Sequence, residues 1–253
     1  MTVSCLTAIV LTLNEERHLP DCLASLRLVS DDIVVLDSGS TDRTFDIAES
    51  SGARVCLRTF DGYASQRNAA LDLVCDAEWV LFLDADERLT EAGAREIHRH
   101  LSTGPDTAAF WLPRRNLFCG RALRGGGWWP DEQARLFRYG RVRYDESRQV
   151  HEIAVVDGPS VRLHEPITHL NYDSRREFVA KQRHYTDIRV HEARAGGSIP
   201  RRRAFGSAPI RELHRRLIVH RGYRDGATGL FLATVLALEE FRTVWLTRRE
   251  RTS

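Results

Sequence analysis

Three acidic residues, Asp84, Asp86 and Glu87, follow the apolar run 79–83 at close spacing. Side chains at positions i and i+2 of an extended chain leave the same face, so the two aspartates are expected side by side. Like charges held this closely are unfavourable unless a cation lies between them. Mg²⁺ and Mn²⁺ take oxygen ligands and are often shared between one or two carboxylates and substrate phosphates. The pair therefore predicts a site for a nucleoside diphosphate that binds together with Mg²⁺ or Mn²⁺.

Polar residues also follow two other expected strands. Asn14 comes after an apolar run at 7–13, and Asp37 ends another at 32–37. Ligands of open parallel sheets bind beyond the carboxyl ends of the strands, so these residues are expected on one rim with Asp84. A single polar or acidic residue there is more often a helix cap or a solvated loop residue, but three such residues on one rim favour a binding site. No glycine follows the first strand and no G-x-x-x-x-G-K-[ST] run occurs, which disfavours a dinucleotide fold and a P-loop.

The first hundred residues alternate between apolar runs and amphipathic segments. Expected strands cover 7–13, 32–37, 54–58 and 79–83, and expected helices cover 19–26, 42–51, 64–74 and 90–101. This alternation predicts an α/β fold with a mostly parallel sheet and helices on both faces. After about residue 105 we expect short strands at 108–113, 134–137, 142–144 and 160–163, a helix at 174–194, a linker at 195–208, and helices at 209–221 and 226–247.

Composition restricts the class of protein. A chain of 253 residues with 42% hydrophobic and 28% charged residues suits one large α/β domain or a domain with an appended segment. The net charge of +2 does not call for a nucleic-acid partner.

The cysteines have no metal-site or redox-pair spacing, and Cys5, Cys22, Cys56 and Cys75 are expected to be buried. The apolar start lacks a basic region, so we expect a first strand rather than a signal peptide, and a cytoplasmic chain.

Four segments, in order, resemble the motifs of glycosyltransferase family 2: IVLTLNEE (9–16), VVLDSGSTDRT (34–44), ASQRNAAL (64–71) and FLDADE (82–87). The resemblance implies the GT-A fold of nucleotide-diphospho-sugar transferases. Later segments resemble the lipopolysaccharide-core β-1,4-glucosyltransferase branch (WaaE/KdtX-like): GGWWPDEQARLFR (126–138), VHE (150–152), ITHLNY (167–172), EFVAKQRHYT (177–186) and GYRDGATGLFLATVLALEEF (222–241). The resemblance thus covers roughly the whole chain. It implies a GT-A domain at 1–195, with a nucleotide-sugar half at about 1–105 and an acceptor half at about 106–195, followed by C-terminal helices at 209–247.

The resemblance also implies donor-binding residues: Thr12, Asn14, Glu16, Asp37, Arg67 and Asp84. Asp37 would accept a hydrogen bond from the base, and Asp84 would lie toward the ribose. Arg67 would reach the base or a phosphate, because a guanidinium suits oxyanions, or it would serve only to pack an amphipathic helix. Asp86 would bind the metal ion, which would neutralise the leaving diphosphate.

An inverting transfer needs a base that deprotonates the acceptor hydroxyl opposite the leaving group. The resemblance gives this role to Asp131, with the adjacent Glu132 as the alternative. Strand alternation points the two in opposite directions, so only one should face the sugar. Four residues near Asp131 in sequence and one histidine are candidates to contact the acceptor or to support the site: Trp128, Trp129, Gln133, Arg135 and His151. The tryptophans stack on sugars or fill a core. Gln133 and Arg135 hold the loop or contact donor phosphate.

Histidines form a second polar cluster. His151 and His169 suit hydrogen-bonded residues that line an acceptor cleft or support the metal loop, and their spacing has no helical or hairpin metal signature. In related GT-A enzymes a downstream histidine completes the metal site, which keeps His151 as a candidate ligand.

The C-terminal apolar segment 226–247 is interrupted by Glu239, Glu240 and Arg242, so we do not expect it to span a membrane. Arginines flank it on both sides. They suit either a solvated surface or attachment to anionic lipid, which leaves peripheral contact with the inner face of the cytoplasmic membrane open.

We therefore expect an inverting glycosyltransferase that forms a β-glycosidic bond. By resemblance it moves a hexose, glucose, from UDP to a cell-envelope glycolipid such as the lipopolysaccharide inner core. A polyprenyl-phosphate sugar synthase, or another envelope-polysaccharide glycosyltransferase, would keep the fold and change the acceptor. A non-catalytic sugar-nucleotide binding protein is the alternative of another class, and the intact D-x-D pair and the acid at position 131 count against it.

Overall fold

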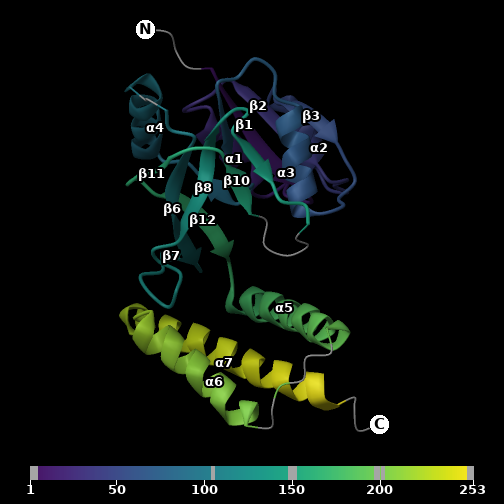
Figure 1. The fold of residues 1–253 in the computed structure, drawn as a ribbon, viewed down its shortest axis with the longest axis vertical. Coiled ribbons are helices and arrows are strands. Elements are labelled where there is room, and N and C mark those ends of the chain that lie inside the picture. Colours follow the sequence, from purple (N-terminus) through teal and green to yellow (C-terminus); the bar gives the residue numbers. More distant parts are fainter. Residues whose placement is uncertain (1–4, 104–105, 148–152, 197–199, 201–202, 250–253) are drawn as a thin grey trace. The chain divides into compact units, whose positions relative to one another are not determined.

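The computed structural model describes residues 5–103, 106–147, 153–196, 200 and 203–249 (Figure 1). The chain folds into two compact units, which are described separately. The first contains Met1–Arg114 and Glu132–His169, and the second contains Arg115–Asp131 and Leu170–Ser253. Helix α5 (Arg175–Ala195) belongs to the second unit, together with the C-terminal helices. The functional domains inferred from resemblance, 1–195 and 209–247, stay a prediction.

A single sheet forms the centre of the first unit, with the strand order β3-β2-β1-β4-β8-β6-β12-β5. Strands β1 to β4 pair in parallel and occupy Leu6–Thr12, Asp32–Asp37, Arg54–Leu57 and Trp79–Phe82. The later strands β5 (Glu87–Arg88), β6 (Ala109–Phe118), β8 (Glu132–Arg138) and β12 (Ile167–Tyr172) add antiparallel pairs. Strand β11 (Ser160–Arg162) pairs with β6, and β9 (Val142–Tyr144) pairs with β10 (Ala154–Val156). The predicted α/β fold with a mostly parallel sheet is confirmed.

Apolar side chains alternate between the two faces of the sheet and are buried by helices on both. In β1, Ala8 and Val10 belong to one core cluster and Ile9 to the other. The first cluster takes residues from α1, α2 and α4, and the second from α3. These helices cover Leu19–Leu26, Thr44–Ser50, Tyr63–Asp72 and Glu91–Thr103. Strands β1, β2 and β4 are thus almost entirely buried, whereas the edge strand β3 is partly exposed, and the carboxyl ends of the strands are the positions left for a site.

Helices and a glycine contact organise the second unit. Helix α7 (Gly226–Arg249) packs against both α5 and α6 (Ala204–His214) (Figure 1). Their core joins Phe118, Tyr172, Phe178 and Leu232, and the short strand β7 (Arg121–Ala122) pairs with the end of β6. A Cβ at Gly229 would lie 1.9 Å from the carbonyl oxygen of Gly222, so a glycine is required where α7 meets the preceding turn. None of the described helices is both long and apolar enough to cross a bilayer.

Two sequence predictions about the second unit are wrong, and four strands of the structure were not predicted. The linker expected at 195–208 ends early because α6 begins at Ala204, and Pro209 lies inside the helix rather than at its start. The helix expected at 209–221 continues past α6 only as a π-helix, Arg215–Val219, before a 3₁₀ helix at Gly222–Asp225. Strands β5, β7, β10 and β12 had not been expected. Three of these have only two or three residues, which is too short for a periodic pattern.

Burial of the cysteines also differs from the prediction. Cys22 is buried and Cys56 is half-buried, but Cys5 and Cys75 are exposed at the ends of their elements. Burial raises the pKa of the Cys22 thiol, which donates a hydrogen bond to the carbonyl oxygen of Asp84 at 3.5 Å. This contact attaches α1 to the turn that carries the acidic pair.

Helix α4 is attached to the segment before β12 through the buried Glu96. Its carboxylate accepts backbone N–H bonds from His164 (3.1 Å) and Glu165 (2.8 Å) and contacts the His164 ring. Burial alone would raise the pKa of Glu96, but these hydrogen bonds outweigh it, so the folded-state pKa lies below the ordinary value. A carboxyl group with a depressed folded pKa stabilises the fold above its unfolded pKa, and this contribution is lost as the pH falls through the folded pKa.

We expect Glu96→Gln to lower the free energy of unfolding by about 2 kcal/mol at pH 7, because the neutral amide is a weaker acceptor for the backbone donors. The difference from the wild type should shrink as the pH falls through the depressed folded-state pKa of Glu96, where Glu96 itself becomes protonated. Urea denaturation at pH 7 and pH 3 measures it. Glu91→Gln, in the exposed first turn of the same helix, is the matched control. A deficit that is equally large at both pH values would contradict the role of the charge.

Candidate functional site

A pocket of about 430 Å³ lies at the carboxyl ends of β1, β2 and β4 in the first unit. Four residues predicted from the sequence line it: Thr12, Arg67, Asp84 and Asp86. They are joined by Ser38, Gln66 and the aromatic side chains of Phe60 and Tyr63. The structure therefore brings together residues from three strand ends and one helix, as expected for a ligand site in an open α/β sheet.

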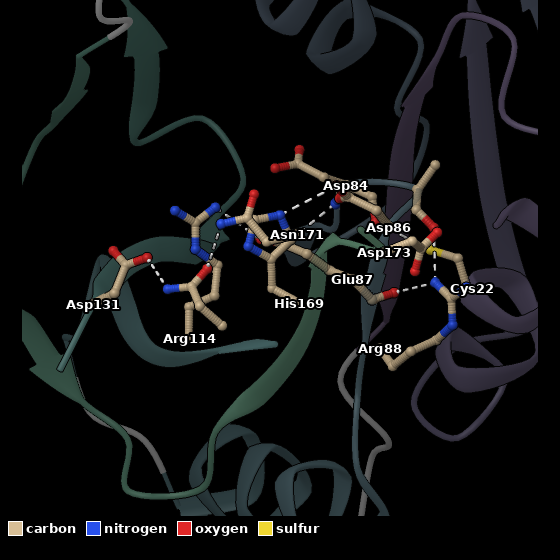
Figure 2. Close-up of polar contacts among 12 residues, drawn as sticks. Cys22, Asp84, Asp86, Glu87, Arg88, Arg114, Asp131, His169, Asn171 and Asp173 are labelled. Atoms are coloured by element: carbon tan, nitrogen blue, oxygen red, sulfur yellow. Dashed lines mark hydrogen bonds and ion pairs between the residues drawn. The ribbon is translucent and has the colours of Figure 1, made fainter. Parts of the chain in front are cut away.

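The turn after β4 presents its two aspartates to this pocket (Figure 2). Asp84 and Asp86 are partly exposed, whereas the intervening Ala85 and the following Glu87 are buried. Glu87 closes the turn on itself: its N–H donates to the Asp84 carbonyl (2.8 Å), and its carboxylate accepts from the Asp84 N–H (3.1 Å). The third acid of the sequence motif is thus a structural residue that fixes the other two.

Arginines surround Asp84. Arg135 forms an ion pair with it, and Arg67 lies 3.2 Å away on the other side. Burial alone would raise the pKa of Asp84, but the charges of Arg135 and then Arg67 hold it well below its usual range. Asp84 is therefore a carboxylate at any pH near neutrality, and its negative charge is already balanced by protein. This leaves Asp86 as the member of the pair that is better suited to a metal ion.

Asp86 has a histidine beside it. Its Oδ2 lies 3.1 Å from Nε2 of His169, and both side chains are at most about one-quarter exposed. The pairing of β5 with β12 places His169 opposite Glu87, which brings the imidazole to the neighbouring Asp86. Across the part of the chain that the structure describes, no group of three or more His, Cys, Asp or Glu side chains is arranged to hold a metal ion. A metal here would need oxygen atoms from a ligand as well as these two residues.

Arg67 is a pocket residue with a packing role. It is buried, and its guanidinium lies over the rings of Phe82 (5.1 Å) and Tyr144 (5.5 Å). The packing alternative left open by the sequence therefore describes these contacts, and contact with a base or a phosphate stays a prediction. The aromatic contacts help to hold the guanidinium beside Asp84, and the Arg67 side chain forms part of the pocket lining.

Three other predicted donor residues lie outside the pocket lining. Asp37 is fully buried and accepts hydrogen bonds from Thr12 Oγ1 (2.8 Å) and the backbone N–H groups of Gly39 (3.0 Å) and Ser40 (2.7 Å). Asn14 accepts from the Thr41 N–H (2.8 Å) rather than capping the following helix, and Glu16 accepts from the Arg43 N–H (3.2 Å). These residues join the loops after β1 and β2, and any contact with a nucleotide base stays a prediction.

Asp131 lies in the second unit, where a buried amide holds it. Asn116 Nδ2 donates to Asp131 Oδ2 and to the Trp128 carbonyl oxygen, both at 2.9 Å. Asn116 is 1% exposed, and its own oxygen accepts a 3.4 Å bond from the buried Asn171. The side-chain amide of Asn116, itself bonded to that of Asn171, thus holds one carboxylate oxygen of Asp131 and the backbone carbonyl of Trp128.

The remaining predicted residues have varied surroundings. Trp128 packs against Tyr172 and Phe178 in the core of the second unit, which favours the structural alternative, whereas Trp129 is half-buried beneath Arg115. Glu132 pairs with Arg162 at 3.0 Å. Gln133 is half-buried in β8, opposite Leu112. Arg135 holds the acidic turn through Asp84 and Glu87. His151 lies outside the described residues.

Glu87 has the largest structural role at the site. It is fully buried and receives Arg135 at 2.7 Å and Arg114 at 3.3 Å. We expect Glu87→Gln to lower the free energy of unfolding by about 3 kcal/mol, because the buried Arg135 and the half-buried Arg114 lose part of their counter-charge. Thermal or urea denaturation measures it. Glu78→Gln, which removes an exposed pair with Arg138, should cost less than about 1 kcal/mol. Equal losses in the two variants would contradict the burial argument.

Sequence reasoning left the place of His169 open and missed two asparagines. His169 had been expected, with His151, either to line an acceptor cleft or to support the metal loop, and it lies beside Asp86 in that loop. Asn116 and Asn171 had not been singled out. The alternation ITHLNY indicates a strand with Thr168, Leu170 and Tyr172 on one face and His169 and Asn171 on the other. That pattern would have placed a polar face next to the site, but the partner of each residue depends on the strand pairing.

Residues 7–149 match the family profile described as Glycosyl transferase family 2. The chain belongs to this family and is a glycosyltransferase. A relative from Rhizobium meliloti, "Lipopolysaccharide core biosynthesis glycosyltransferase LpsC", is 32% identical over 251 residues, covering 94% of this chain and 90% of the relative. The resemblance identified in the sequence, including its lipopolysaccharide-core branch, is thereby confirmed.

Further similarities are partial. An uncharacterized glycosyltransferase of Rickettsia bellii is 37% identical over 92 residues, which is 36% of this chain and 31% of that relative. The crystal structure of residues 1–349 of TarS from S. aureus matches with a TM-score of 0.51 at 17% identity, over 74% of this chain and 65% of that one. At this level of identity the likeness shows the fold alone, which is GT-A.

Proposed function

We propose that this glycosyltransferase moves a hexose from a nucleotide-diphospho-sugar to the inner core of a lipopolysaccharide-type glycolipid and inverts the anomeric centre. The observation that carries the proposal is the pocket at the strand ends, where Asp86 and His169 lie next to an arginine-bound Asp84. The similarity to LpsC over nearly the whole chain supports the acceptor class. UDP and glucose are the donor components to test first.

Within this proposal, Asp86 and His169 hold a divalent cation. The residues fit such an ion because the Asp86 carboxylate lines a pocket large enough for a diphosphate, and an imidazole nitrogen of His169 lies 3.1 Å from that carboxylate. Mn²⁺ accepts mixed oxygen and nitrogen ligands, and Mg²⁺ prefers oxygen, so both require testing. A bound cation would supply positive charge to the leaving diphosphate.

The chain itself positions the donor. Thr12 and Arg67 line the pocket, and the Arg67 guanidinium suits the base or an anionic phosphate oxygen. Asp84, kept ionised by Arg135, can accept hydrogen bonds from ribose hydroxyls without changing its charge. Asn14, Glu16 and Asp37 support the donor through the paired loops that frame the pocket.

We assign the base to Asp131. Asn116 holds one carboxylate oxygen in place, and a carboxylate so positioned can take the proton from an acceptor hydroxyl. Asn116 is a positioning residue in this scheme, because it touches Asp131 and not the substrate. Glu132 pairs with Arg162 and is the less suited of the two acids.

A panel of nucleotide sugars tests the proposed donor. The protein is mixed with UDP-, GDP- and dTDP-sugars in Mg²⁺, in Mn²⁺ and in EDTA, and thermal stability and donor hydrolysis are measured together. A UDP-sugar should stabilise the protein in at least one cation and not in EDTA. If no nucleotide sugar stabilises it with either cation, the donor proposal is wrong.

The second unit suggests how a glycolipid acceptor could be reached. Several large apolar side chains are exposed on its helices: Ile210, Ile218, Val219, Leu238, Phe241 and Trp245. Arginines lie in the same turns, as in helices that lie on an anionic membrane surface. We include peripheral membrane contact in the proposal. Co-sedimentation with vesicles of phosphatidylglycerol, but not of phosphatidylcholine, would support it, and equal absence from both pellets would refute it.

A further inference from the structure

A second pocket lies entirely within the second unit, on one side of α5. It has a volume of about 370 Å³, and its lining comes from α5 and one residue of α7: Arg175, Arg176, Val179, Ala180, Arg183 and Phe231. The α5 residues follow the i, i+4, i+8 spacing of one helix face. Three guanidinium groups therefore surround a floor made of apolar side chains.

None of these three arginines has an ion-pair partner among the described residues. Two nearby acids of α5 are engaged elsewhere. The Glu177 carboxylate accepts the Asp173 N–H (2.8 Å) at the helix start, and Asp187 pairs with Arg242 (2.8 Å). Arg175 lies over the Phe231 ring at 5.0 Å. The pocket thus gathers three positive charges that the described part of the protein does not neutralise.

This combination selects a ligand of a particular chemistry. Guanidinium groups bind phosphate and carboxylate oxygens through paired hydrogen bonds, and a phosphate monoester brings more negative charge than a carboxylate. The apolar floor of Val179, Ala180 and Phe231 suits a hydrocarbon portion beside that anion. A free inorganic anion would use only half of the pocket.

The pocket is fixed to the core that also carries Trp128, three residues before Asp131. Phe231 packs on Phe178 at 6.2 Å, and Phe178 packs on Trp128 at 6.3 Å. A ligand anchored on α5 would therefore be held by the same rigid cluster that holds the segment of the candidate base.

We propose that this pocket binds a phosphate ester carried by the amphipathic acceptor, and so acts as an acceptor subsite. The inference rests on the proposed function for its acceptor class, but its binding chemistry can be measured separately. Its role is to anchor the glycolipid while another part of the acceptor presents a hydroxyl.

Direct binding is tested with octyl phosphate, which combines the anion with a hydrocarbon chain. The variant Arg175→Gln/Arg176→Gln/Arg183→Gln should bind it at least about tenfold more weakly than the wild type. The matched control Arg121→Gln/Arg211→Gln/Arg224→Gln removes the same charge from exposed arginines of the same unit and should leave the affinity within about twofold. Equal losses in both variants, or equally tight binding of octyl glucoside, would overturn the proposal.

A kinetic experiment identifies the source of the phosphate. With detergent-dispersed inner-core lipopolysaccharide as acceptor, the pocket variant should raise KM at least about tenfold and keep kcat. With acceptor stripped of its phosphates, the variant and the wild type should have the same KM. If the variant instead loses only co-sedimentation with vesicles that contain phosphatidic acid, at unchanged KM, the pocket binds membrane lipid and the acceptor subsite is refuted. UDP binding in Mn²⁺ should be identical in all variants, so its general absence would refute the proposed function and not this pocket.

Discussion

Asp131→Asn should lower kcat by about a thousandfold while the affinity for UDP in Mn²⁺ stays the same. The amide has nearly the same shape as the carboxylate and still offers an oxygen to Asn116, so the local structure should persist. What it loses is the ability to take a proton from the acceptor hydroxyl. Release of UDP from UDP-glucose, with inner-core lipopolysaccharide as acceptor, measures kcat, and isothermal titration measures the affinity.

The neighbouring acid supplies the control. Glu132→Gln removes an ion pair with the largely exposed Arg162 and should change kcat by less than about threefold. A reversed result, with the large loss at Glu132, would transfer the role of base to that residue. A small loss in both variants would favour the polyprenyl-phosphate alternative, because an acceptor phosphate is already ionised and needs no strong base.

Asp86→Ala should reduce the affinity for UDP in Mn²⁺ to the value that the wild type shows in EDTA. At a ligand concentration one hundred times Kd, the wild type should gain about 2.7 kcal/mol of stability from the ligand, and the variant should gain almost none. The reason is that Asp84 is already paired with Arg135 and Arg67, so it cannot replace the missing carboxylate. Thermal shift with and without EDTA measures this difference.

Two further variants sharpen the experiment. Asp46→Ala removes an exposed aspartate from α2 and should leave the response to the cation unchanged. His169→Ala should weaken the response in the same direction as Asp86→Ala, since the imidazole lies 3.1 Å from the same carboxylate. An Asp86 variant that keeps its cation-dependent binding would remove the metal site from the proposed mechanism.

Local patterns predicted the nucleotide half of the fold well. The apolar runs that end at Asn14, Asp37 and Asp84 became β1, β2 and β4, because parallel strands buried on both faces leave an unmistakable hydrophobic signal. These strands depend on neighbours in sequence, which the sequence displays directly. Asp84 and Asp86 both line the pocket, but they lie in a turn after β4 rather than on the extended chain that the i, i+2 argument assumed.

The interactions that make Glu87 a buried structural residue and Asp86 a candidate metal ligand could not be predicted in the same way. Glu87 resembles Asp86 in sequence, but it is buried because Arg114 and Arg135 arrive from β6 and β8. His169 reaches Asp86 only through the pairing of a two-residue strand with β12. Register between distant strands decides both cases, and no local pattern encodes it.

The hydrogen bonds between Glu87 and the backbone of Asp84 have a thermodynamic consequence for ligand capture. Because the turn is already closed, its conformational entropy is lost when the protein folds and not when the nucleotide arrives. Binding free energy is then available for holding the diphosphate rather than for ordering a loop. A substitution that loosened this turn should first appear as a slower capture and weaker retention of the donor, in a protein that still folds.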